Sequence, residues 1–159
     1  MAKQPIALFP IPAIEDIEPD IRNRMLNVQE KVGFIPNIFL ALAAKPAEFR
    51  AFFDYHDALM DSAETLTKGE REMIVVATSG LNQCLYCVVA HGAILRIREK
   101  DPTLSDQLST NFRKAAITSR QRAMLEYAVK VSQAAHEVTE KDHAPLKAEG
   151  FSQDDIWQI

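Results

Sequence analysis

Two helical patterns that meet at a short break near Gly80 restrict the fold of this chain more than any other feature. Thr67 and Glu70 form a capping-box pattern that begins a helix, and the apolar run after it stops at Gly80, a residue typical of helix ends. Asn82 is a favoured N-cap for a second helix, which we expect to continue to about Glu99. The sequence therefore predicts two helices that fold back on each other.

The second of these helices carries both cysteines of the chain, Cys84 and Cys87, followed by His91. The spacing i, i+3, i+7 places the three side chains on one face of a helix. A thiol is a good nucleophile only as the thiolate, which a helix N-terminus or a nearby base favours. With Asn82 as the cap, Cys84 falls in the first turn, and His91 lies one turn beyond Cys87, where it can exchange a proton with that thiol. This pattern predicts a reactive dithiol.

Glu72, on the first helix, is the candidate carboxylate. On one continuous helix Glu72 and His91 would be roughly 28 Å apart, but in a hairpin that turns at residues 80–82 they lie about 12 and 13 Å from the turn and come level. Glu70 is expected to serve the cap, which leaves Glu72 to orient the imidazole. An ion pair of Glu72 with Arg71 or Lys68 on the surface is the alternative that spacing alone leaves open.

Caps and apolar periodicity predict helices along the rest of the chain. Besides the hairpin, we expect helices over 20–32, 37–44, 46–61, 102–110, 119–135 and 140–150, and a last one that begins at 152. The first of them starts at Asp20, and Asn37 is expected to cap the second. We predict an all-α, single-domain bundle over 1–159, in which the last helix stops after barely one turn and is expected to be truncated.

The segment 1–19 contains four prolines and cannot form a regular helix. It also carries Ile6, Leu8, Phe9 and Ile11, so we expect an extended arm that covers its own core or a neighbouring subunit. The aromatic residues of helix 46–61 indicate core or subunit interface and not a cofactor site. His56 is expected on a polar, solvated face of that helix.

Composition excludes several classes of function. The 159 residues carry a net charge of −4 with no basic cluster, which argues against nucleic-acid binding. No apolar run approaches the ~20 residues that span a membrane. The N-terminus lacks the pattern of a signal peptide, so we expect a cytoplasmic protein. Two cysteines three residues apart in such a chain indicate redox or metal chemistry and not a structural disulfide.

The pattern E-x11-C-x-Y-C-x-x-x-H, from Glu72 to His91, resembles the alkylhydroperoxidase-D-like and carboxymuconolactone-decarboxylase-like fold group, and is closest to its peroxidase-related branch. The similarity extends from the N-terminal F-P-x-P segment to F-S-Q-D-D-I-W near the end. It implies an all-helical, oligomeric protein that reduces hydroperoxides through its cysteine pair.

The resemblance also implies roles for individual residues. Cys87 would attack the peroxide, Cys84 would resolve the product as a disulfide, and Glu72 and His91 would relay protons. The best-studied members have a second histidine just before the second cysteine, where this chain has Tyr86. Tyr86 can donate a hydrogen bond but is a poor base near neutral pH, so we expect at most a supporting role.

We therefore predict a thiol-dependent peroxidase acting on hydrogen peroxide or alkyl hydroperoxides. No flavin, haem or nucleotide motif is present, so no bound cofactor is expected and the electrons would come from a lipoyl or thioredoxin-like protein. A homo-oligomer (dimer, trimer or hexamer) is expected. The main alternative is a dithiol/disulfide module or thiol sensor without peroxidase activity.

Two further alternatives are weaker. Cys84, Cys87 and His91 supply three ligands for zinc, but structural sites need a fourth, so we expect no metal. A ring-substrate decarboxylase, the other activity of the fold group, does not depend on this cysteine pair. His136 and His143 are expected near the surface, without a chemical role.

Overall fold

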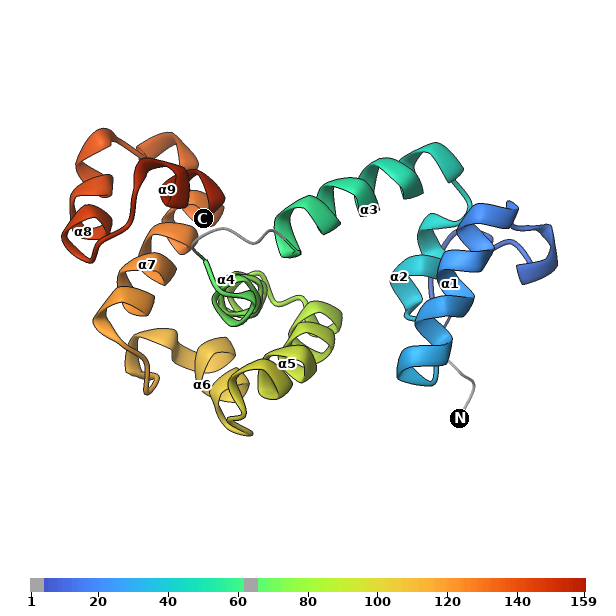
Figure 1. Ribbon diagram of the computed structural model, residues 1–159, viewed down its shortest axis with the longest axis horizontal. Helices are drawn as coiled ribbons and strands as arrows, with labels where there is room; N and C mark the ends of the chain where they lie inside the picture. The colour runs from blue at the N-terminus through green and yellow to red at the C-terminus, as the bar shows by residue number, and fades with distance from the viewer. Residues whose placement is uncertain (1–4, 62–65) are drawn as a thin grey trace. The chain divides into compact units, whose positions relative to one another are not determined.

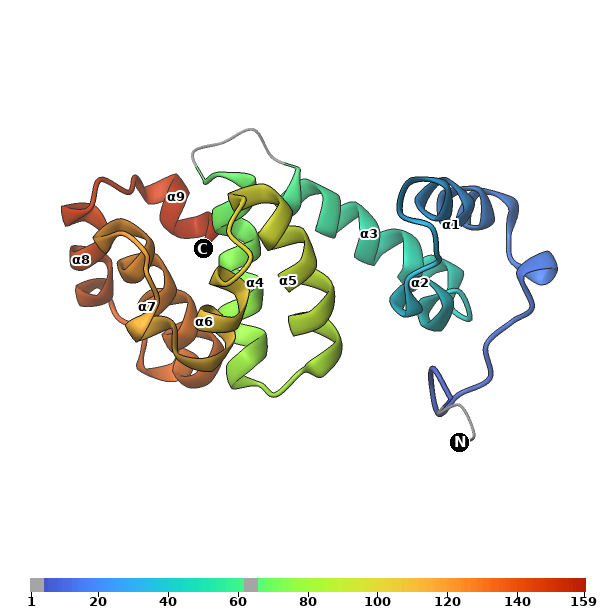
Figure 2. The same ribbon diagram turned by 90° about the horizontal axis from the view of Figure 1, so that it is seen from below.

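The computed structural model describes residues 5–61 and 66–159, and every regular element in these two stretches is a helix (Figures 1 and 2). The all-α prediction is therefore confirmed. The chain separates into two compact units, Met1–Leu59 and Met60–Ile159, which are described one at a time. The sequence predicts one domain over residues 1–159, and this stays a prediction. None of the described helices is both long and apolar enough to span a bilayer.

The first unit contains a 3-10 turn, Ile14–Asp16, followed by α1 (Pro19–Val32), α2 (Asn37–Leu42) and most of α3 (Pro46–Met60). Phe39, Phe49 and Phe53 pack with ring centroids 4.2–5.8 Å apart in its core. The predicted cap at Asn37 is wrong: Pro36, whose backbone is extended as is typical of an N-cap, is the capping residue, and Asn37 is already helical.

The N-terminal arm has no regular structure from residue 5 to the 3-10 turn and bends at residues 6, 8 and 9, while residues 1–4 lie outside the described part. Leu8 is 95% exposed and Phe9 is 80% exposed. These two side chains therefore do not cover the core of the first unit. Whether the arm covers another surface stays a prediction. Ile17, just before α1, is buried and joins the core of the first unit.

The second unit is built around α4 (Lys68–Leu81), which Figure 1 shows nearly end-on with the other helices around it. These are α5 (Leu85–Glu99), α6 (Leu104–Asn111), α7 (Ser119–Ala134), α8 (His143–Ala148) and α9 (Gln153–Gln158). Met73, Val76 and Ala77 of α4 are buried in a core shared with α5, α6, α7 and α9. Three short 3-10 turns, Phe112–Lys114, Ala135–Glu137 and Glu140–Asp142, complete this unit.

The predicted capping box at the start of α4 is present. The Thr67 hydroxyl accepts the Glu70 N–H, and the Glu70 carboxylate accepts the Thr67 N–H. Glu70 also pairs with Arg120 of α7, whose guanidinium lies 3.8 Å from the centre of the Phe151 ring. Glu70 thus ties the first turn of α4 to α7 and to the segment before α9, which fixes the helix that presents Glu72.

Candidate active site

The connection between α4 and α5 differs in detail from the predicted one. Asn82 is the C-cap of α4 and not the N-cap of α5, so that prediction is wrong. The Cys84 N–H donates to the Ser79 carbonyl at 2.9 Å, and Gln83 adopts the left-handed conformation with φ of 55°. Gln83 is not helical, and Cys84 has an extended backbone. Cys84 is therefore the N-cap of α5, which begins at Leu85.

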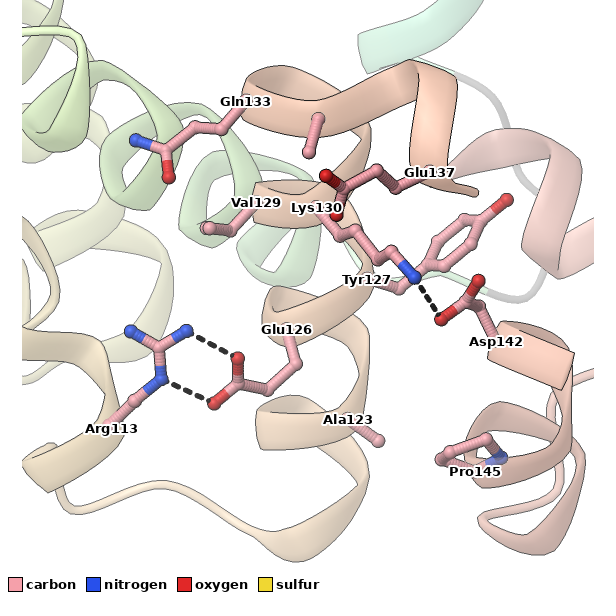
Figure 3. Close-up of a pocket in the computed structure, with 11 residues that line it drawn as sticks. Arg113, Ala123, Glu126, Tyr127, Val129, Lys130, Gln133, Glu137, Asp142 and Pro145 are labelled. Atoms are coloured by element: carbon pink, nitrogen blue, oxygen red, sulfur yellow. Dashed lines mark hydrogen bonds and ion pairs between the residues drawn. The ribbon is translucent and has the colours of Figure 1, made fainter. Parts of the chain in front are cut away.

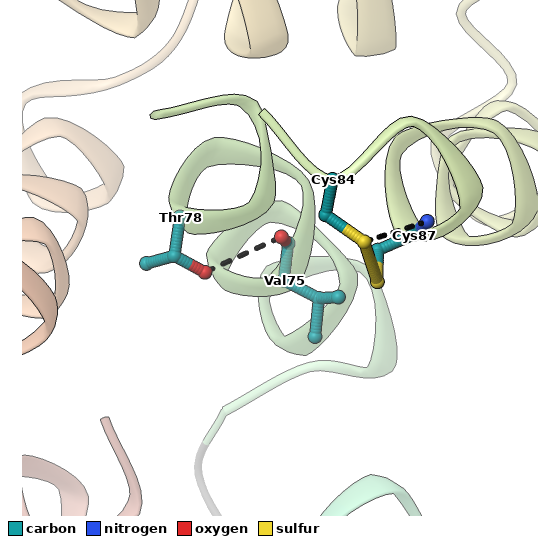
Figure 4. The surroundings of a disulfide bond; sticks show 4 residues. All are labelled: Val75, Thr78, Cys84 and Cys87. Carbon is teal, nitrogen blue, oxygen red and sulfur yellow. Dashed lines mark hydrogen bonds between the residues drawn. A yellow bond between two sulfur atoms is a disulfide. The ribbon is translucent and has the colours of Figure 1, made fainter. Parts of the chain in front are cut away.

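The two cysteines form a disulfide at the start of α5, with Cα atoms 5.5 Å apart (Figure 4). The Cys84 sulfur accepts the N–H of Cys87 at 3.4 Å, and both residues are partly exposed. In Figure 4 Val75 of α4 lies between the cysteine pair and Thr78. The Thr78 hydroxyl is turned to its own helix, where it lies 2.7 Å from the Ile74 carbonyl and 3.3 Å from the Val75 carbonyl. The sulfurs thus lie on the seam between the two helices with one side open to solvent.

Glu72 and His91 meet across the same seam. The Nδ1 atom of His91 lies 2.8 Å from Oε2 of Glu72. Glu72 is only 6% exposed, and 24% of the His91 side chain is exposed. A carboxylate can only accept in this bond, so Nδ1 carries the proton and Nε2 is the nitrogen left to exchange protons with a neighbour. The two helices bring together the acid and imidazole that are 19 residues apart in sequence, and a surface pair of Glu72 with Arg71 or Lys68 is not formed.

The position of His91 on α5 is also fixed from the α6 side. Gly92 is buried, and a Cβ atom placed on it would collide with the Ser105 hydroxyl of α6. The Ser105 side chain is 1% exposed, so it has little space into which to retreat. The backbone next to His91 is therefore held between α4 and α6.

Tyr86 lies between the cysteines in the first turn of α5 and is 40% exposed. The two other histidines of the second unit have different neighbours: His143 is 3.3 Å from the Tyr127 hydroxyl, and His136 is 3.5 Å from the Glu137 carboxylate. In the first unit, His56 is 3.1 Å from the Asp57 carboxylate, which also accepts two bonds from Arg24. Within 5–61 and 66–159 no group of three His, Cys, Asp or Glu side chains is arranged to hold a metal ion.

A cavity of about 520 Å³ that the sequence did not suggest is lined by α7 and by residues near α8 (Figure 3). Four of its five charged groups pair with one another: Lys130 with Asp142 at 2.6 Å, and Arg113 with Glu126 through two hydrogen bonds. The fifth, Glu137, lies 3.5 Å from the Nε2 atom of His136. None of the four candidate catalytic residues lines it. No sequence motif marks this cavity, because its lining comes from separate turns of amphipathic helices.

The fold and the seam together define a class of protein: an all-helical hairpin that presents a C-x-x-C pair beside a Glu–His pair. Comparison with known proteins agrees with this class. Residues 46–140 match the model of the carboxymuconolactone decarboxylase family, and the chain belongs to that family. None of the curated proteins compared with the chain matches it.

Two solved structures are similar over nearly the whole chain. One is described as an alkylhydroperoxidase AhpD core, an uncharacterized peroxidase-related protein from Ralstonia eutropha JMP134; it is 59% identical with a TM-score of 0.95, over 98% of this chain and 82% of its own. The other, an uncharacterized peroxidase-related protein from Silicibacter sp. TM1040, is 35% identical with a TM-score of 0.93, over 99% of this chain and 83% of its own. The family and the fold predicted from the motif are therefore confirmed.

Proposed function

We propose that this protein is a thiol-dependent hydroperoxidase that reduces hydrogen peroxide or alkyl hydroperoxides through Cys84 and Cys87. The observation that carries the proposal is the 2.8 Å bond between Glu72 and His91 on the seam where the cysteine pair lies. Membership of a family whose solved members are described as peroxidase-related supports the same class of reaction.

In the first step the Cys87 thiolate attacks the terminal peroxide oxygen. The O–O bond breaks, the sulfur becomes a sulfenic acid, and the leaving oxygen takes up a proton to form water or an alcohol. The Cys84 thiol then attacks the sulfur of that sulfenic acid and forms the Cys84–Cys87 disulfide. The displaced hydroxide takes the proton of the Cys84 thiol and leaves as water. An external dithiol returns two electrons and two protons, and is itself oxidised to a disulfide.

His91 has the position of a proton carrier in this cycle. Nδ1 is engaged by Glu72, so Nε2 takes the proton from the Cys87 thiol, one turn earlier on α5, and passes it to the leaving oxygen. The buried Glu72 fixes the tautomer and stabilises the imidazolium that forms in between. The N–H that Cys84 accepts from Cys87 would stabilise the Cys84 thiolate as a leaving group when the disulfide is reduced.

Single-turnover peroxide consumption tests the proposal and the order of the two thiols. The reduced protein should consume one equivalent of peroxide and form one disulfide. Cys87→Ser should abolish consumption, whereas the matched variant Cys84→Ser should consume one equivalent and stop at a trappable sulfenic acid. Unchanged consumption by Cys87→Ser would refute the assignment, and an exchange of the two phenotypes would reverse the roles of the cysteines.

A dithiol/disulfide module without peroxidase activity is the second candidate, and Tyr86 is the residue that favours it. The resemblance implies a histidine at that position in the best-studied relatives, and a tyrosine cannot supply a base near neutral pH. Reversible oxidation by a disulfide reagent, combined with negligible peroxide turnover in stopped-flow measurements, would establish this alternative.

The electron donor proposed for the cycle is a lipoyl or thioredoxin-like protein, because the reaction needs a dithiol and the sequence carries no motif for a redox cofactor. We place the protein in the cytoplasm, where reductants keep such thiols reduced. Recycling assays with dihydrolipoamide and with reduced thioredoxin would identify the donor by the faster rate.

A further inference from the structure

The two sulfurs of the cysteine pair have different surroundings at the start of α5. Cys84 is the N-cap, and its sulfur accepts the N–H of Cys87 at 3.4 Å. The Cys84 N–H donates to the Ser79 carbonyl at 2.9 Å, a backbone bond that ties this residue to α4 without involving the sulfur. The Cys84 sulfur can therefore keep its N–H donor when the S–S bond is broken, and the helix N-terminus favours a negative charge on it.

Cys87 lies inside the first turn of α5 and has His91 one turn further along the same helix. Because the Nδ1 atom of His91 carries the proton toward Glu72, the Nε2 atom of the neutral imidazole presents a lone pair. A lone pair can take the proton of the Cys87 thiol, but it has no proton to give to a Cys87 thiolate. A negative charge left by reduction of the disulfide is therefore more stable on Cys84 than on Cys87.

Few other ionisable groups are present in the hairpin. From residue 72 to residue 95 the ionisable side chains are Glu72, the two cysteines, Tyr86 and His91. Glu72 is bonded to His91, and the connection at residues 79–83 carries no charged side chain. Within the hairpin, the difference between the two sulfurs thus depends on the N–H of Cys87 and on the imidazole of His91.

We propose that the dithiol donor attacks the sulfur of Cys87, so that the donor is held on Cys87 while Cys84 leaves as a thiolate. This inference rests on the disulfide cycle of the proposed function. In thiol–disulfide exchange the more acidic of the two thiols leaves faster. The same sulfur, that of Cys87, thus receives the peroxide oxygen in one half of the cycle and the donor in the other.

The exchange has two steps. A donor thiolate forms an S–S bond with Cys87, the Cys84–Cys87 bond breaks, and its electron pair stays on Cys84. The second donor thiolate then attacks the donor's own sulfur, which closes the donor disulfide and expels Cys87. The donor has lost two electrons and two protons: one proton ends on Cys87, and the other is released to solvent while Cys84 stays ionised.

The first test locates the donor on the oxidised wild-type protein. The probes are reduced glutathione and a thioredoxin variant that keeps only its attacking cysteine, since a single thiol cannot close a disulfide of its own. Acid quenching early in the reaction and alkylation with N-ethylmaleimide give each cysteine its own label. Fragment ions of the tryptic peptide 72–96, which contains both cysteines, should show the probe on Cys87 and the alkyl group on Cys84. The probe on Cys84, or equal amounts on the two cysteines, would overturn the proposal.

The second test compares the two thiols in single-cysteine variants. Cys87→Ser keeps the N–H at residue 87 and leaves Cys84 alone, whereas the matched variant Cys84→Ser keeps a good N-cap and leaves Cys87 alone. At about pH 7, below the ordinary thiol pKa of about 8.5, iodoacetamide should alkylate Cys84 at least about tenfold faster than Cys87, the factor expected for one hydrogen bond to a charged group. Equal rates, or faster alkylation of Cys87, would contradict the assignment.

Neither test involves peroxide, so the two proposals fail separately. A protein that does not consume peroxide would refute the proposed function, and the position of the probe would still decide between the two sulfurs. The probe on Cys84 would refute the present inference and leave peroxide reduction untouched.

Discussion

Replacing His91 by leucine should destabilise the protein strongly, and replacing Glu72 as well should restore part of the loss. His91→Leu leaves the Glu72 carboxylate 6% exposed and without its partner. Removing one partner of a buried charged pair typically costs about 3 kcal/mol or more. Adding Glu72→Met removes the stranded carboxylate and fills a similar volume, so the double variant should regain about 2 kcal/mol of the free energy of unfolding.

The measurement is a double-mutant cycle by urea denaturation at neutral pH, with the cysteine pair oxidised in all four proteins. The coupling energy between Glu72 and His91 should be about 1.5–3 kcal/mol, the range for hydrogen bonds to charged groups at buried sites. The control cycle uses Arg113 and Glu126, whose hydrogen bonds are equally short but whose side chains are 55% and 43% exposed. That surface pair should couple by less than about 1 kcal/mol.

Burial of Glu72 is the reason why the Glu72–His91 pair should couple more strongly than the Arg113–Glu126 pair, and two results would refute this. If the double variant were less stable than His91→Leu by the full cost of Glu72→Met alone, the two side chains would not be coupled. Equal coupling energies in the two cycles would show that burial of Glu72 does not strengthen its bond to His91. In either case Glu72 would lose its proposed part in orienting the imidazole.

Two more predictions concern packing and pH. Gly80→Ala should lower the free energy of unfolding by about 2 kcal/mol in urea denaturation, because the new Cβ would lie 2.5 Å from the Ser109 carbonyl oxygen and force α4 and α6 apart. Gly150→Ala is the control: nothing lies within 4 Å of its new Cβ, and only the φ of 84° is unfavourable, so it should cost about 1 kcal/mol. The hydrogen bond from Lys130 lowers the pKa of Asp142 to about 2. The stability contributed by the ionised Asp142 is fully present above the unfolded-state pKa of about 4 and is lost as pH falls through about 2. Asp142→Asn should therefore lower the melting temperature at pH 7, and the difference in melting temperature from the wild type should close on acidification. A difference independent of pH would contradict this reasoning.

The hairpin could be predicted because its signals are local. Thr67 and Glu70 begin α4, and the region around Gly80 ends it, both through bonds within a few residues. Residue type predicts Asn82 as the cap of α5, but the bond from the Cys84 N–H to the Ser79 carbonyl and the left-handed Gln83 decide where the helix starts. Residue preferences do not contain that geometry.

The sequence by itself determined the all-helical fold, the family and the side chains able to do the chemistry, because helix caps, apolar periodicity and the C-x-Y-C-x-x-x-H spacing are each encoded within a few turns of chain. The tertiary structure decided that Glu72 bonds His91 and not a neighbouring cation on the surface, and how deeply Glu72 is buried. Those properties depend on contacts between helices, where Gly80 against Ser109 and Gly92 against Ser105 set how closely the backbones approach. No local pattern specifies such distances, since they arise only when the whole second unit packs around α4.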